Sequence, residues 1–180
     1  RLASGKVLAR MVTFVVEKDK NTDVQLVMRE SKEEISVIGT MDPEALYQPL
    51  EGEKKSILST TGRGYFLVAV FGDGDEPSNH AIRDMQSMSA ELAAWGRPIM
   101  VFGQSEANVA KLKGLLDSDM TSFGIDSTSE IRDMLCDGCH SETKTLPVIA
   151  MCDSFGRIVY LSTGYNTSLA SQLRSVIAGI

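Results

Sequence analysis

The motif with the clearest chemical potential is Cys136-Asp-Gly-Cys139-His140, in which two thiols stand three residues apart and an imidazole follows. Two such thiols can form a reversible disulfide, attach a c-type haem together with the histidine, or supply part of a zinc site. A haem needs a large apolar pocket, and a small α/β core is already filled by side chains. Zinc needs four ligands, so Cys152 or His80 would have to approach the motif. A loop dithiol without a catalytic role is the remaining reading.

The predicted position of this dithiol disfavours thiolate chemistry. Ser127-Thr-Ser-Glu130 has the spacing of a capping box and predicts the start of a helix that carries Ile131, Met134 and Leu135 on one face. Cys136 and Cys139 therefore fall at the C-terminal end of that helix. The helix dipole stabilises a thiolate at the opposite end, the N-terminus.

Two other groupings have the residue types of a site without the required spacing. His80 has only Ser78 and Asp84 near it in sequence, and positions along one helix do not give the geometry of a catalytic triad. The stretch from Gly72 to Asp75 is too short and too acidic to bind phosphate. It also lacks the alternating ligands and the terminal Glu of a calcium-binding loop.

The elements that must position these residues alternate between strand and helix. Apolar runs predict strands, and apolar residues at three- and four-residue spacing predict helices. From residue 65 the predicted order is strand 65–71, a helix capped by Asp75 or Ser78 that ends before Gly96, strand 99–102, helix from 105, strand 120–125, helix from 127, strands 148–152 and 158–161, and a helix capped by Asn166 or Thr167. Asp153-Ser-Phe-Gly156 supplies a tight turn between the last two strands. This order predicts an α/β fold with a mixed sheet and helices on both faces.

The first part of the chain has a different character. Residues 1–39 are β-rich, with strands predicted at 7–16 and 24–28, and we interpret them as the end of a β-sandwich domain that begins before this sequence. Residues 40–64 form a connecting region in which Asp42-Pro-Glu-Ala-Leu46 predicts a single helical turn. The α/β domain then covers residues 65–180.

The α/β region resembles a thioredoxin-like domain of the peroxiredoxin and thiol-disulfide reductase branch. Thr145-Leu-Pro147-Val is similar to the cis-proline signature of that family, and the Asp153-x-x-Gly156-x-Ile-Val segment is similar to its hairpin. The whole chain also resembles the C-terminal part of secreted bacterial proteins that carry a transglutaminase-like domain. That second resemblance implies an extracytoplasmic location, in the periplasm or at the cell surface.

The sequence departs from the family at the place where the chemistry is expected. Relatives carry their catalytic Cys-x-x-Cys, or the peroxidatic Cys, just after the first core strand, whereas residues 71–80 contain no cysteine. The carboxylates of Asp73, Asp75 and Glu76 would raise the pKa of a thiol placed there. The resemblance therefore implies the fold and argues against the activity that usually accompanies it.

We accordingly expect a non-catalytic module of a larger secreted protein, used for assembly or for binding a protein or peptide. In redox-active relatives the backbone beside the cis-proline pairs with an extended peptide, so Thr145, Leu146 and Pro147 are the candidate peptide-binding residues. The plainer reading is that Pro147 only sets the loop geometry. The alternative function is a thiol-disulfide oxidoreductase that uses the displaced pair Cys136 and Cys139.

Composition restricts the partners. The net charge of −6 gives no electrostatic support for nucleic-acid binding. No apolar run approaches the roughly 20 residues that a membrane-spanning helix needs. We expect no cofactor, and we expect the partners to be other domains of the same polypeptide or an extended peptide or protein.

Overall fold

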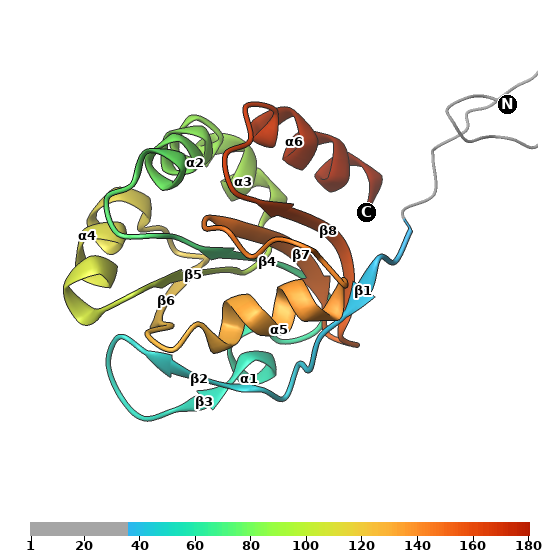
Figure 1. Cartoon of the computed structure of the whole chain (residues 1–180). Coiled ribbons are helices and arrows are strands. Elements are labelled where there is room, and N and C mark those ends of the chain that lie inside the picture. Colours follow the sequence, from blue (N-terminus) through green and yellow to red (C-terminus); the bar gives the residue numbers. More distant parts are fainter. Residues whose placement is uncertain (1–35) are drawn as a thin grey trace, which may run out of the picture. The chain divides into compact units, whose positions relative to one another are not determined.

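The computed structural model describes residues 36–180, so the strands predicted at 7–16 and 24–28 lie outside the described residues. The described chain is built on an eight-stranded sheet with the order β1-β8-β7-β4-β5-β6-β2-β3 (Figure 1). The strands are β1 (Gly39–Thr40), β2 (Leu46–Pro49), β3 (Lys55–Ser56), β4 (Tyr65–Val70), β5 (Ile99–Gly103), β6 (Thr121–Ile125), β7 (Val148–Asp153) and β8 (Arg157–Thr163). The helices are α1 (Ile57–Thr61), α2 (Glu76–Ser87), α3 (Ser89–Trp95), α4 (Glu106–Leu116), α5 (Glu130–Gly138) and α6 (Leu169–Gly179).

The centre of the sheet confirms the predicted mixed α/β architecture. Strands β4, β5 and β6 are parallel, because α2, α3 and α4 carry the chain back between them. Strand β7 is antiparallel to β4, and β8 is antiparallel to β7 because a tight turn joins them. None of the helices in the described residues is long and apolar enough to cross a membrane.

Helices cover both faces of the sheet (Figure 1). Successive residues of a strand point to opposite faces, and all those of β4 after Tyr65 are buried. Phe66, Val68 and Val70 belong to one core cluster together with residues of α5 and α1. The intervening Leu67 and Ala69 face the layer that contains α2, α3, α4 and α6.

Two predicted helices differ from the structure. The stretch 42–46 forms a turn, because the carboxylate of Asp42 accepts a hydrogen bond from the Glu44 N–H at 3.0 Å and the chain then enters β2. The single helix predicted between the Asp75 or Ser78 cap and Gly96 is two helices, α2, capped by Asp75, and α3, which meet at the fully buried Met88. The Ser87 hydroxyl donates to the Asp84 carbonyl at 2.7 Å, and such a bond competes with the helical pattern.

Helix α5 begins under a different cap from the predicted one. Both oxygens of the buried Asp126 carboxylate accept helix N–H groups, from Ile131 at 2.9 Å and from Arg132 at 3.1 Å. Ser129, the residue before the helix, makes no side-chain capping bond and has a φ of 64°. The sequence signal of a capping box therefore gave the correct helix and the wrong capping residue.

Candidate functional site

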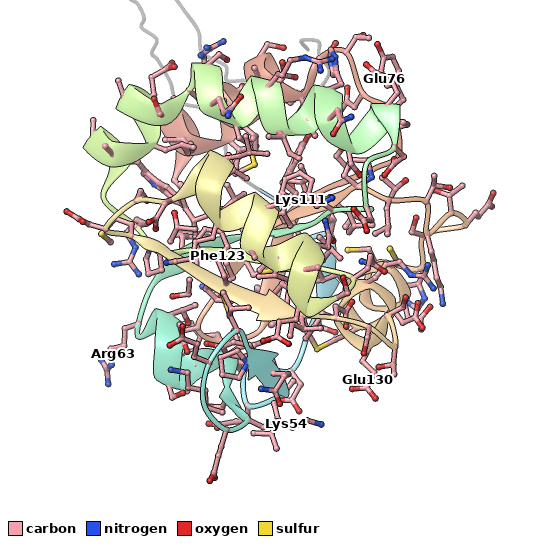
Figure 2. All side chains as sticks on the ribbon, turned by 90° about the vertical axis from the view of Figure 1, so that its left-hand side faces the viewer. Lys54, Arg63, Glu76, Lys111, Phe123 and Glu130 are labelled. Carbon is pink, nitrogen blue, oxygen red and sulfur yellow. The ribbon has the colours of Figure 1, made fainter. Side chains whose placement is uncertain are left out.

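The predicted peptide-binding loop lies beside the acidic loop that follows β4. Val70, the last residue of β4, pairs with Val148, the first residue of β7. The loop 71–75 and the loop 143–147 therefore meet at one end of the sheet. Figure 2 shows Glu76 at the start of α2 and Glu130 at the start of α5 near this same end of the molecule. Thioredoxin-like proteins of the redox-active kind would be expected to place a thiol here.

The acidic loop closes the N-terminus of α2 with its own hydrogen bonds. The carboxylate of Asp75 accepts from the Ser78 N–H at 3.3 Å, and the buried Ser78 hydroxyl oxygen accepts from the Gly72 N–H at 2.7 Å. The Gln104 amide donates to the Phe71 carbonyl at 3.0 Å and ties the loop to the end of β5. The Ser78 N–H, one of the helix-start donors that could stabilise a thiolate, is thus already used within the chain.

Helix α4 holds the same loop from the other side. The Asp73 carboxylate accepts from the Asn108 amide at 3.4 Å and forms an ion pair with Lys111 at 3.5 Å (Lys111 is labelled on α4 in Figure 2). Asn108 is itself buried, and its side-chain oxygen accepts from the Gln104 N–H at 2.7 Å. These contacts account for the conformation of the acidic loop without a bound ligand.

The proline loop leaves main-chain groups available. The Leu146–Pro147 peptide bond is cis, and the Gly164 N–H donates to the carbonyls of Thr145 at 2.8 Å and Pro147 at 2.9 Å. The N–H and carbonyl of Leu146 make no hydrogen bond with any of residues 36–180. Thr145 is exposed, whereas Pro147 is buried under the loop. A free N–H and carbonyl on one residue at a sheet end are what an added strand requires.

An exposed aromatic residue stands next to Gly164, which holds the proline loop. Tyr165 has 55% of its surface exposed, and its ring centroid lies 4.9 Å from that of His80 on α2. The His80 Nε2 lies 3.6 Å from the Asp84 carboxylate. Because the Ser78 hydroxyl is bonded to the Gly72 backbone, the structure does not bring Ser78, His80 and Asp84 together as a triad.

The three cysteines lie on the α5 face of the sheet. Cys136 and Cys152 are fully buried within the core cluster, and the half-buried Cys139 packs against that cluster. Burial raises the pKa of Cys136 and of Cys139 above the ordinary value of a thiol. Burial raises the pKa of Cys152 furthest, with additional contributions from the nearby Cys139 and Asp153. At neutral pH these thiols are therefore protonated and weak as nucleophiles.

The structure does not assemble a ligand set around the Cys-x-x-Cys-His motif. Among residues 36–180 no three His, Cys, Asp or Glu side chains are placed to hold a metal ion. His80 belongs to α2, on the opposite face of the sheet from Cys136, so it cannot complete a zinc site with the motif. A c-type haem would need both thiols at the surface, and Cys136 has 0% of its surface exposed. His140 is exposed, just beyond the end of α5.

Close packing between α5 and β1 explains the glycine of the motif. A Cβ added to Gly138 would overlap the carbonyl oxygen of Thr40. A Cβ added to Gly39 would lie 2.5 Å from the Gly138 carbonyl oxygen and 2.7 Å from the Cys139 sulfur. The end of α5 therefore packs directly on the backbone of β1. Sequence reasoning assigned no role to Gly138, because the residue it contacts is about a hundred positions away.

Replacing Gly138 with alanine is expected to lower the free energy of unfolding by about 1–3 kcal/mol, because the new methyl group meets backbone that cannot rotate away. Chemical denaturation followed by circular dichroism measures the change. Gly114 is the matched control, since a Cβ on that α4 residue meets no atom within 4 Å. Gly114→Ala should be neutral or stabilising, and a Gly138→Ala protein as stable as the parent would contradict the packing assignment.

The fold that these elements form is thioredoxin-like. No protein-family model and no curated protein matches the sequence. A thiol:disulfide interchange protein DsbE from Chlorobium tepidum is similar over 83% of this chain and 99% of its own, with 14% identity and a TM-score of 0.58. The bacterioferritin comigratory protein of Xanthomonas campestris is similar over 79% of this chain and 98% of its own, with 10% identity and a TM-score of 0.58.

A third solved structure is a secreted disulfide oxidoreductase of Mycobacterium tuberculosis. It is similar over 76% of this chain and 96% of its own, with 10% identity and a TM-score of 0.55. At these identities the likeness establishes the fold and carries no residue-level assignment.

Proposed function

We propose that this chain is a non-catalytic thioredoxin-like module that binds an extended segment of a protein at the proline loop. The observation that carries the proposal is the unpaired main chain of Leu146 just before the start of β7, near the exposed residue Tyr165. An extended peptide can pair with that main chain, and the ring of Tyr165 can make apolar contact with one side chain of the peptide. The closed N-terminus of α2 supports a binding role over a redox role at this place.

We further infer that the module belongs to a larger secreted protein and acts outside the cytoplasm. The support is the resemblance to the C-terminal part of secreted transglutaminase-like proteins, together with similar structures that are described as a DsbE and a secreted oxidoreductase. Other domains of the same polypeptide are then natural sources of the bound segment. Fractionation of the native host cells, with antibody detection of the protein, tests the location. We expect the protein outside the cytoplasm, and recovery from the cytoplasm alone would contradict the inference.

The binding proposal is tested by selecting extended peptides from a displayed library on the full 180-residue chain and mapping them by NMR. We expect the largest shift changes at residues 71–75, 144–147 and 164–165. Tyr165→Ser should weaken binding of the selected peptides by about five- to thirtyfold, since it removes an aromatic contact, formed on binding, worth about 1–2 kcal/mol. Phe155→Ser is the matched control, because Phe155 is an aromatic residue, 81% exposed, in the turn at the other end of β7. Peptides that map elsewhere, or that lose equal affinity in both variants, would refute the proposal.

A thiol-disulfide oxidoreductase that uses Cys136 and Cys139 is the second candidate. The observation in its favour is that the two residues lie within one turn, with the Cys139 N–H donating to the Cys136 carbonyl at 3.2 Å. Their burial weighs against it, because both thiols keep a raised pKa. Insulin reduction that is lost in Cys136→Ser, in a protein of unchanged fold, would establish this candidate in place of the binding module.

A further inference from the structure

The described residues contain a cleft at the end of the sheet opposite the proline loop. It lies between helices α2 and α3 on one side and the connection from α4 to β6 on the other, and its volume is about 660 Å³. Ile99 and Thr121, which begin β5 and β6 and pair with each other, line its base. Small-molecule sites usually measure about 300–1,000 Å³, so this cleft has the size of a ligand site.

The interior of the cleft is apolar and adaptable. The buried Met85 and Leu92 line it from the two helices, the half-exposed Leu115 lines it from the end of α4, and the half-buried Met120 lines it from the connection. Methionine side chains are unbranched and fit ligands of different shapes. A single hydrogen bond, from the Gln86 amide to the Leu115 carbonyl at 3.1 Å, joins α2 to the end of α4 beside the cleft. Figure 2 shows α4 running in front of the sheet, with α2 and α3 above it.

The rim of the cleft carries one unpaired carboxylate. Within residues 36–180, the ionisable side chains that line the cleft are Asp117 and Asp119, and both are exposed. Lys113, which does not line the cleft, lies 3.7 Å from the Asp117 carboxylate and offsets its charge. Asp119 forms no ion pair with any residue of the described range 36–180. A largely apolar cavity with one unpaired carboxylate at its rim favours a cation over an anion.

We propose that this cleft binds a small amphipathic cation, in which an apolar body carries one primary ammonium group. The apolar body packs against the half-buried Leu116 and Met120, and the ammonium group donates hydrogen bonds to the Asp119 carboxylate. The site is separate from the proline loop, because the two lie at opposite ends of the parallel strands. It does not depend on the proposed peptide binding.

The test uses three probes of similar size on the full chain: 4-phenylbutylamine, the neutral 4-phenylbutanol and the anionic 4-phenylbutyrate. In NMR titrations at low salt we expect the amine to shift residues 115–121 and to bind at least about tenfold more tightly than the carboxylate, with the alcohol between them. Asp119→Asn should weaken the amine about three- to tenfold and leave the alcohol unchanged. Glu51→Gln, which removes an exposed carboxylate from the β2–β3 loop, should change neither.

A pair of variants on α3 tests the location. Ala93 lines the cleft and Ala94 does not, and both residues are exposed. Ala93→Trp should fill the cleft and abolish amine binding, whereas Ala94→Trp should leave it unchanged at an equal melting temperature. The proposal is overturned if the amine shifts no residue of 115–121, if the alcohol or the carboxylate binds as tightly as the amine, or if Ala93→Trp binds normally.

Discussion

Replacing Asp153 with alanine is expected to lower the free energy of unfolding by about 2–4 kcal/mol, among the largest losses that one polar side chain of this domain can cause. Asp153 ends β7 and has 2% of its surface exposed. Its Oδ1 accepts from the N–H groups of Phe155 and Arg157, both at 3.0 Å, and its Oδ2 accepts from the Arg157 guanidinium at 2.7 Å. The Asp153→Ala substitution would leave the N–H groups of Phe155 and Arg157 without their hydrogen-bond acceptor.

Two controls separate the parts of this effect. Arg157→Ala removes the half-exposed partner of the ion pair and keeps the two main-chain bonds, so it should cost about 0.5–1 kcal/mol. Asp153→Asn retains one acceptor oxygen and should fall between the two. Urea denaturation of the three variants gives the ranking. If Arg157→Ala costs as much as Asp153→Ala, the main-chain bonds of Asp153 are not the source of its contribution.

The thiols of the native protein are expected to react at least about 100-fold more slowly with iodoacetamide at pH 7.5 than those of the unfolded chain. Cys136 and Cys152 are fully buried, and Cys139 is accessible only in part. Mass spectrometry after timed alkylation measures each site. Cys139 should be modified first, and Cys136 and Cys152 only at the rate of unfolding. Rapid native labelling of Cys136 would contradict the burial and would favour the oxidoreductase reading.

The pH dependence of Cys139 gives an independent check. Its pKa is raised by burial, so its alkylation rate should keep increasing about tenfold per pH unit beyond pH 8.5, where an unperturbed thiol begins to level off. The folded state prefers the protonated thiol. The contribution of the Cys139 thiol to the free energy of unfolding is therefore complete below the pKa of this thiol in the unfolded chain. That contribution is lost as the pH rises from the unfolded-state pKa through the folded-state pKa. Cys139→Ala should remove the corresponding part of the alkaline loss of stability.

The fold could be predicted from the sequence where its signals are local. The apolar runs of β4 and β5 gave buried strands, and Asp153 and Gly156 marked the turn between β7 and β8. Helix boundaries were less well determined. The break at Met88 coincides with the bond from the Ser87 hydroxyl to the Asp84 carbonyl, and it leaves the helical periodicity of the apolar residues unchanged.

The candidate site was predictable only in its residue types. The sequence by itself determined that the chain has a proline loop before a strand, an acidic loop without cysteine after another, and a dithiol at a helix end. The tertiary structure determined how these segments lie relative to one another and which of their side chains are buried. The pairing of Val70 with Val148 brings the two loops together, and the packing of the end of α5 on β1 and the core buries Cys136 fully and Cys139 in part. The physical reason is that turns and helix periods depend on adjacent residues, whereas burial of a thiol depends on which distant strand the fold places against it.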